Sequence, residues 1–328
     1  MKYALGNMLN GAGGLNADQL SLDLQFAIDK TLTARKGPTP TFTRASTATF
    51  IGSNGLIQSA AINASRFDHD PNTLACKGLL VEESRTNLVF PSDTLSTQTR
   101  TVTAVAHTLS FYGSGTVVLS GAHSATVAGT GAYPSRTTLT FTPTAGSLVL
   151  TVTGSVTQAQ LEVGSFPTSY IPTVSTSIVR SADVCSITGS AFTGFWNRFS
   201  GTCVIGVGSS LGTGPRFVSN LTSARVVEIY GTGYIDFFES SGSQEVRVVT
   251  SPSYPIKLGL AYAINDYQSS YSGVLGGSDT NTGGTIPNAT ELHIGSLGGS
   301  SNRLTGHIQF IRYYKKRLAN TKLQSLTT

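Results

Sequence analysis

Hydrophobic and polar residues alternate along most of the chain with a period of two, which is the period of a β-strand with one buried face. The alternation starts in SLDLQFAID (residues 21–29), where Leu22, Leu24 and Phe26 are separated by polar residues. From about residue 88 onward, the sequence changes to repeated Thr, Val and Gly with very few acidic residues. We therefore predict short strands throughout the folded part of the chain.

Turn signals between these runs indicate how the strands are connected. Ser-Asn-Gly at residues 53–55 stands between two β-like runs, and Asn-Gly favours a tight hairpin because both residues tolerate positive φ. After a second turn, Leu148, Leu150 and Val152 line one face of a predicted strand. The two prolines of FPTSYIPT (residues 166–173) would remove hydrogen bonds from a central strand, so we expect an edge or a link there.

The second half of the chain contains further alternating runs at the spacing of β-sandwich strands. These runs are GTCVIGVG, ARVVEIYG, YIDFFES, QEVRVVT, IKLGLAYA, ELHIGSLG and GHIQFIRYY, starting at residues 201, 224, 234, 244, 256, 291 and 306. In HIQFIRYY (residues 307–314) both alternate sets of side chains include apolar members, which indicates a strand covered on both faces. RLANTKLQSLT (residues 317–327) has the residue types of one or two terminal helical turns.

Composition supports the same structural class. Only 12% of the 328 residues are charged and 36 are glycine, which favours strands and tight turns over amphipathic helices. The 39% hydrophobic residues supply the apolar surface that disordered chains lack. We predict an all-β, multi-domain protein with an N-terminal arm (1–20), a small β module (21–87), a β-sandwich (88–178) and a second, larger sandwich-like domain (179–328).

Charge, cysteines and hydropathy exclude several functional classes. Lysine and arginine number 22 against 17 acidic residues, but they are scattered and do not form the basic stripe with interleaved aromatic residues of a nucleic-acid footprint. We interpret KKR at residues 315–317, near the end of a predicted strand, as a solvated tip. Cys76, Cys185 and Cys203 form no CxxC pair, so we expect buried, reduced thiols. The first residues, MKYALGNMLNGAGG, contain no continuous apolar stretch, so we predict no cleaved signal peptide, and no apolar run reaches about eighteen residues, so we predict no membrane span.

Three stretches resemble parts of known protein families. FTRASTATF (42–50), GLIQSAAINASRFDHDP (55–71) and GLLVEESRTNLV (78–89) together resemble the opening module of tailed-bacteriophage tail-fibre and head-spike proteins. AQLEVGSFPTSYIPT (159–173) resembles the closing strand of the carbohydrate-binding-module-like sandwich that follows that module. RLTGHIQFIRYYKKRLANTKLQSLT (303–327) resembles the last strand and terminal turn of a concanavalin A-like jelly roll of the laminin-G or lectin type.

The resemblance implies a structural protein of the virion surface, made in the bacterial host cytoplasm, as a head decoration, a spike or a tail fibre. It implies attachment to other virion proteins of the capsid or tail through the N-terminal part, with the sandwiches displayed for adhesion. By analogy it also implies a homo-oligomer, commonly a trimer, and it does not require enzymatic activity. We predict no enzymatic activity and no cofactor. A lectin that binds a host surface glycan, a glycan-cleaving depolymerase and a cement or spacer protein remain alternatives.

RFDHDP (residues 66–71) concentrates two acids, a histidine and an arginine in a chain that is otherwise poor in charge. Its acids fit the first half of a D-x-D-x-N calcium loop. However, Thr73 stands where the sharp turn needs glycine, and Leu79 stands where a bidentate acid belongs. We therefore predict no metal site.

A structural role explains the same stretch better than a catalytic one. In an extended chain Asp68 and Asp70 point to one side and the histidine between them to the other, which is not a nucleophile, base and orienter in line. We expect both acids to accept backbone N–H groups in a turn set by the following proline, and to pair with some of Arg44, Arg66 and Arg85.

Catalytic and sugar-binding candidates elsewhere are few, and we predict no catalytic residue. The E-x-D-x-E pattern of related glucanases is absent, and Glu228 faces Asp236 across a hairpin only if the turn between them has the right length. Sugar sites need an exposed aromatic platform, for which Tyr267 and Tyr271 in the polar stretch NDYQSSYSG, taken as a loop, are the candidate ligand-binding residues. Trp196 stands among phenylalanines and is assigned to the core or an interface.

Overall fold

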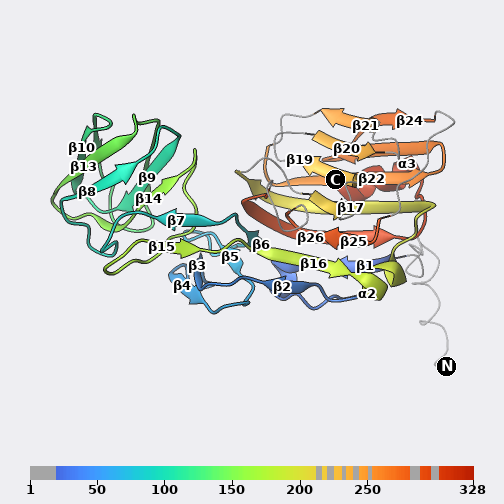
Figure 1. Cartoon of the computed structure of the whole chain (residues 1–328). Coiled ribbons are helices and arrows are strands. Elements are labelled where there is room, and N and C mark those ends of the chain that lie inside the picture. Colours follow the sequence, from blue (N-terminus) through green and yellow to red (C-terminus); the bar gives the residue numbers. More distant parts are fainter. Residues whose placement is uncertain are drawn as a thin grey trace, which may run out of the picture.

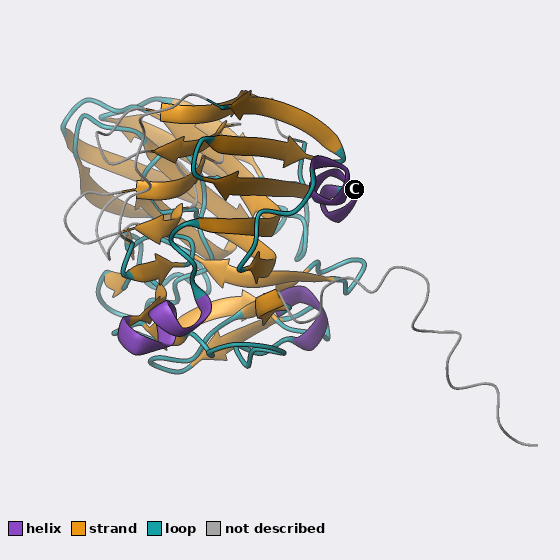
Figure 2. Ribbon diagram, turned by 90° about the vertical axis from the view of Figure 1, so that its right-hand side faces the viewer, coloured by secondary structure: helices purple, strands orange, loops and turns teal. Residues whose placement is uncertain are grey.

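A computed structural model describes residues 20–211, 216–219, 225–230, 234–238, 244–249, 253–280, 289–296 and 303–328. Most described residues form β-strands, which confirms the predicted all-β, multi-domain class (Figure 1). Helices in these ranges are short: α1 (Phe26–Asp29), α2 (Gly189–Phe195) and α3 (Asn320–Thr327), all beside the strands (Figure 2). No helix in the described ranges is long and apolar enough to cross a membrane. Apart from Leu20, the predicted N-terminal arm lies outside the described residues.

The largest sheet of the described chain has eight strands and forms one layer of the larger sandwich. Its order is β24 (Val274–Asp279), β23 (Asp266–Tyr271), β22 (Ile256–Ala263), β17 (Ser200–Ser210), β26 (Gly306–Tyr314), β6 (Cys76–Val81) and β5 (Phe67–His69), with β1 (Leu20–Leu24) also paired to β26. All of these pairings are antiparallel. Successive side chains therefore point alternately into the core and away from it.

Two smaller sheets accompany the eight-stranded sheet. One has the order β2 (Thr41–Thr43), β16 (Val184–Thr188) and β25 (Glu291–His293). The other has the order β18 (Arg216–Ser219), β19 (Arg225–Tyr230), β20 (Tyr234–Phe238) and β21 (Gln244–Val249). One hydrophobic core joins the first of them to the eight-stranded sheet: Phe42, Cys185 and Leu292 pack in the same cluster as Leu79 and Ile308. Burying each large aliphatic side chain in such a core contributes about 1.5–3 kcal/mol.

A smaller sandwich forms a separate body at the other end of the molecule (Figure 1). One of its sheets has the order β11 (Ala125–Ala128), β10 (Thr116–Gly121), β13 (Gly146–Thr153) and β8 (Gln98–Val102), and the other has β12 (Thr137–Phe141), β9 (His107–Tyr112) and β14 (Thr157–Val163). Leu148 and Leu150 are fully buried in its core and Val152 packs against it, as the alternating pattern predicts.

Two strand pairs lie between the sandwiches. The hairpin of β3 (Ala48–Ile51) and β4 (Ile57–Ala60) has the predicted turn, with Gly55 at φ +76°. The other pair joins β7 (Arg85–Asn87) to β15 (Ile178–Arg180), the segments that enter and leave the smaller sandwich. The segment that enters the smaller sandwich and the segment that leaves it are therefore paired with each other.

The N-terminal segment differs from the predicted separate module at residues 21–87. Its strands β1, β5 and β6 belong to the eight-stranded sheet, because β26 pairs Ile311 with Leu24 and Ile308 with Leu79. Alternation along a strand shows which face is buried, but it does not show which strand lies beside it. The predicted boundaries consequently separate segments whose strands share one sheet.

Candidate functional site

Three fully buried arginines, Arg44, Arg66 and Arg180, form the polar centre of the junction between the sandwiches. Arg44 and Arg66 donate to the two carboxylate oxygens of Asp183 at 3.1 and 2.5 Å. Arg66 also reaches Glu82 at 2.7 Å, and Arg180 pairs with the same carboxylate. Unpaired charges are costly in a protein interior, so each of these groups depends on its partners. The network fastens chain segments that are more than a hundred residues apart.

Glu82 connects this network to the smaller sandwich. Its carboxylate accepts the backbone N–H of Ser169 at 2.7 Å and the hydroxyl of the same residue at 2.6 Å. Burial alone would raise the pKa of Glu82, but Arg180 and Arg66 outweigh it, and these contacts hold the pKa at about 2. The ionised carboxylate therefore anchors the Ser169 loop to the larger sandwich at neutral pH.

Asp68, His307 and Ser209 form a hydrogen-bonded row on the outer face of the eight-stranded sheet. His307 Nε2 lies 2.9 Å from Asp68 Oδ2, and His307 Nδ1 lies 2.7 Å from Ser209 Oγ. Ser209 and His307 are Cα partners on β17 and β26, while Asp68 comes from β5, on the far side of β6. Antiparallel partners present side chains on the same face, so this register brings the three groups together.

Gly78 on β6 explains how the Asp68 carboxylate reaches across a whole strand to β26. It is the Cα partner of Asp68 and has φ +111°, a conformation that favours glycine. A Cβ at this position would lie 2.2 Å from the carbonyl oxygen of Ile308. Only glycine therefore lets β6 run this close to β26.

The environment of Asp68 keeps its carboxyl group ionised. Burial opposes ionisation, but the hydrogen bond from His307 and the nearby Lys77 lower the pKa of Asp68 below its ordinary value. The backbone N–H of Ile51 donates to Oδ1 at 2.6 Å, and Lys77 Nζ lies 3.5 Å from Oδ2. An ionised carboxylate only accepts hydrogen bonds, so His307 Nε2 carries a proton, and in the neutral imidazole Nδ1 is then the acceptor of the Ser209 hydroxyl.

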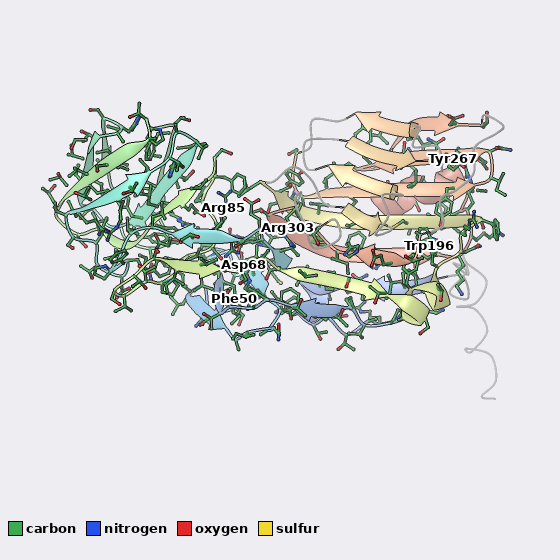
Figure 3. The ribbon with its side chains drawn as sticks, in the orientation of Figure 1. Phe50, Asp68, Arg85, Trp196, Tyr267 and Arg303 are labelled. Carbon is green, nitrogen blue, oxygen red and sulfur yellow. The ribbon has the colours of Figure 1, made fainter. Side chains whose placement is uncertain are left out.

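These three side chains lie in the wall of a cavity of about 280 Å³, hereafter the interdomain cavity. Residues of the N-terminal segment, the smaller sandwich and the larger sandwich all contribute to it. Its lining consists of Thr49, Phe50, Ile51, Ile57, Asp68, Pro71, Lys77, Leu80, Glu82, Tyr112, Tyr133, Pro134, Arg136, Pro167, Thr168, Ser169, Tyr170, Ser209, Leu211, Thr305, Gly306 and His307. Figure 3 shows the labelled Asp68 at this junction.

The smaller sandwich supplies an aromatic pair and a cation to the interdomain cavity. The rings of Tyr112 and Tyr133 lie with their centroids 5.2 Å apart and their planes inclined by 57°. Arg136 is held in place because it donates to the carbonyl of Thr168 and the hydroxyl of Ser110, both at 2.7 Å. The cavity thus combines aromatic surface with fixed polar groups.

The predicted polar cluster is divided among several places. Arg44 and Arg66 pair with Asp183, and Arg66 also with Glu82, rather than with the acids of RFDHDP. Asp70 accepts the backbone N–H groups of Asn72 and Thr73 at 3.0 and 2.8 Å, the turn role expected for it. Arg85 pairs with Glu83 and covers the ring of Phe166 at 4.9 Å. Among the described residues, no group of three acids, histidines or cysteines is placed to hold a metal ion.

The predicted aromatic candidates lie away from the cavity (Figure 3). Tyr267 and Tyr271 belong to strand β23 and not to the loop expected from the sequence. Tyr267 is 2% exposed within the core, and Tyr271 is half-buried against it. Trp196 is buried and stacks on Tyr313 with ring centroids 4.6 Å apart, in line with its assignment to the core. Tyr267 therefore offers no exposed ring to a sugar.

The acidic pair considered for glycoside cleavage does lie in register. Glu228 on β19 and Asp236 on β20 are Cα partners, so the intervening turn has the length that the pairing requires. Their side chains are not among those that the structure describes.

Sequence reasoning missed Ser209, His307, Tyr133 and Arg136 as members of one site. His307 is an isolated histidine in the sequence, and Ser209 is one of many serines. The single available signal was that both residues stand at the ends of predicted strands, where functional side chains often occur.

Comparisons with known proteins give partial similarities. No family model matches the sequence, and no curated protein sequence matches it either. Among solved structures, the CBM40 domain of a Ruminococcus gnavus IT-sialidase bound to α2,3-sialyllactose is 13% identical over 40% of this chain and 83% of that chain, with a TM-score of 0.33. Trypanosoma rangeli sialidase in complex with sialic acid is 13% identical over 44% and 26% of the two chains, with a TM-score of 0.33. The NanB sialidase from Streptococcus pneumoniae is 13% identical over 43% and 26%, with a TM-score of 0.34.

Proposed function

We propose that the protein binds a carbohydrate of a host cell surface in the interdomain cavity. Proteins bind sugars through aromatic side chains that cover the apolar ring face and through a few placed polar groups that hydrogen-bond the hydroxyls. The observation that carries the proposal is the joint lining by Tyr112 and Tyr133 and by Arg136, Lys77 and Asp68. The volume of about 280 Å³ lies near the lower end of ligand pockets, roughly 300 Å³, and suits one sugar unit of a longer glycan.

The proposed setting of this binding is the surface of a bacteriophage virion, and its support is the sequence resemblance described above. In this setting the N-terminal part attaches to a capsid or tail protein, and homo-oligomers present several copies of the cavity. Several weak sites on one particle increase the overall affinity without any new contact, which suits a cavity of modest size.

The proposal concerns binding and not cleavage of glycosidic bonds. Its support is the absence of the E-x-D-x-E pattern from the sequence. If the protein were instead a depolymerase, the two carboxyl groups for glycosidic cleavage would be those of Glu228 and Asp236, which are Cα partners. Release of reducing ends from a host polysaccharide, abolished by Glu228→Gln, would replace the binding proposal with that activity.

A glycan array probed with the full chain tests the proposal. We expect saturable binding that Tyr133→Ala weakens at least about tenfold, because the substitution removes one of the two aromatic rings. Phe199→Ala is the matched control, since Phe199 is 62% exposed and lies outside the cavity lining. Binding that survives Tyr133→Ala but is lost in Tyr271→Ala would move the site to β23, and absence of any bound glycan would refute the proposal.

A further inference from the structure

The row of Asp68, His307 and Ser209 contains the three parts of a nucleophilic centre: a hydroxyl, a base and a group that orients the base. The hydroxyl and the base are 2.7 Å apart, and the base and the carboxylate are 2.9 Å apart. Both distances are within the range required for proton transfer between such groups. All three residues line the interdomain cavity. The row therefore borders the cavity that is proposed above to bind a carbohydrate.

The Asp68 carboxylate determines which nitrogen of His307 carries a proton. Because ionised Asp68 accepts the proton of His307 Nε2, the neutral imidazole has its lone pair on Nδ1, which lies 2.7 Å from Ser209 Oγ. His307 is only 8% exposed, and its ring is held between Ser209 on the adjacent strand β17 and Asp68 on β5, beyond β6. In known serine triads the base nitrogen is Nε2, whereas here it is Nδ1, but either ring nitrogen can take a proton when the other is held by an acceptor.

A sheet is also a rigid support for such a row. Ser209 stands beside a β-bulge, since the register of β17 with β26 shifts between Val207 and Ser209. Bulges redirect a side chain and are frequent next to active sites. Gly78 lets β6 run close enough to β26 for Asp68 to reach His307.

We propose that Ser209 is a nucleophile that cleaves an ester on the carbohydrate bound in the interdomain cavity, with His307 as its base and Asp68 as a positioning residue. The sugar part of this inference rests on the proposed function. An O-acylated sugar is the matching substrate class, because a serine hydroxyl activated by a histidine attacks acyl carbons, whereas most glycosidases use a pair of carboxyl groups.

Each step balances with water as the only co-reactant. Ser209 Oγ bonds to the ester carbonyl carbon while its proton passes to His307 Nδ1. The bond from that carbon to the sugar oxygen then breaks, and the sugar oxygen takes the proton from His307. Water attacks the acyl-serine, gives its proton through His307 to Ser209 Oγ, and releases the carboxylic acid. Lys77 and Arg136 are the cationic groups of the cavity lining that supply positive charge for the oxyanion.

A fluorophosphonate probe tests the nucleophile in the intact chain. We expect one covalent adduct, located on Ser209 by peptide mass spectrometry, and no adduct in Ser209→Ala. His307→Gln should slow labelling by about 100-fold, as removal of a general base does. Ser210→Ala is the control that keeps labelling, because Ser210 bonds to the carbonyl of Leu304 at 3.3 Å and lies outside the cavity lining. An unlabelled folded protein, or equal labelling of Ser209→Ala, overturns the inference.

Acetate release tests the substrate class. We expect hydrolysis of 6-O-acetylglucose by the wild type and none by Ser209→Ala. Asp68→Asn should lower kcat by 10²–10⁴-fold with little change in KM, which a purely structural role of Asp68 would not produce. Hydrolysis of 4-nitrophenyl acetate without hydrolysis of 6-O-acetylglucose overturns the carbohydrate part.

The experiments can refute glycan binding and the serine nucleophile independently of each other. Ser209→Ala should still bind the glycan on the array, since the substitution leaves the aromatic pair in place. Glycan binding without probe labelling leaves the proposed function standing and refutes the nucleophile.

Discussion

Glu82 and Arg180 form an ion pair that is almost completely buried, although 98 residues separate them in the chain. Glu82 directly follows strand β6 of the larger sandwich, and Arg180 is the last residue of β15, the segment that returns from the smaller one. A pairing of this kind holds both sandwiches in one arrangement. The interdomain cavity depends on that arrangement, since its walls come from both bodies.

Glu82→Gln should destabilise the protein by about 3–5 kcal/mol, because it leaves Arg66 and Arg180 buried without their shared counter-charge. Urea unfolding followed by tryptophan fluorescence measures the loss. Asp29→Asn is the control: it breaks an ion pair with Arg35 at the surface, and the unfolding midpoint should not move measurably. Equal effects of the two substitutions would contradict the role assigned to the buried network.

Stability should fall in acid through the titration of Glu82. Its pKa is about 2 in the folded protein and 4.5 ordinarily, so folding favours the ionised form. This contribution is complete above about pH 4.5 and is lost as the pH falls toward 2. Melting temperatures measured from pH 7 to pH 2.5 should drop more steeply for the wild type than for Glu82→Gln below pH 4.5. Parallel curves would show that Glu82 does not account for the acid sensitivity.

Thiol reactivity should separate the three cysteines. Burial raises the pKa of Cys185 and Cys203 well above its ordinary value, so neither forms the reactive thiolate in the folded state. Cys76 is half-buried, and its pKa is also raised, by a smaller degree of burial. We expect slow modification of Cys76 alone by Ellman's reagent in native buffer, and three modified thiols in 6 M guanidinium chloride. Rapid modification of Cys185 in the native state would contradict its position in the core.

The period-two patterns predicted the strands well, because alternation reports directly which face of a strand is buried. Leu22 and Leu24, for example, are both fully buried in β1. The same pattern carries no information on the partner strand. It therefore did not reveal that β1 and β6 pair with different halves of the same edge of β26. Sheet order is a long-range property that depends on the whole core.

The site was predictable only in part for the same reason. Asp68 stood out because charge is rare in this sequence, but its partner His307 is 239 residues away. Arg44 and Arg66 were expected to pair with nearby acids, whereas Asp183, their actual partner, is 139 and 117 residues distant. Acids embedded in apolar runs, such as Glu82 after GLLV, were the available signal, since a buried acid requires a buried cation.

Gly78→Ala should separate Asp68 from His307 and destabilise the protein. The added Cβ would meet the carbonyl of Ile308 at 2.2 Å, and φ +111° is strained for alanine, so we expect a loss of at least about 2 kcal/mol. Gly194→Ala is the matched control, because Gly194 lies in α2 and, apart from its chain neighbours and the helix backbone, no atom lies within 4 Å of the added Cβ. There alanine should be neutral or stabilise by up to about 1 kcal/mol. Urea unfolding distinguishes the two, and an unchanged midpoint for Gly78→Ala would show that β6 can move away from β26 without cost.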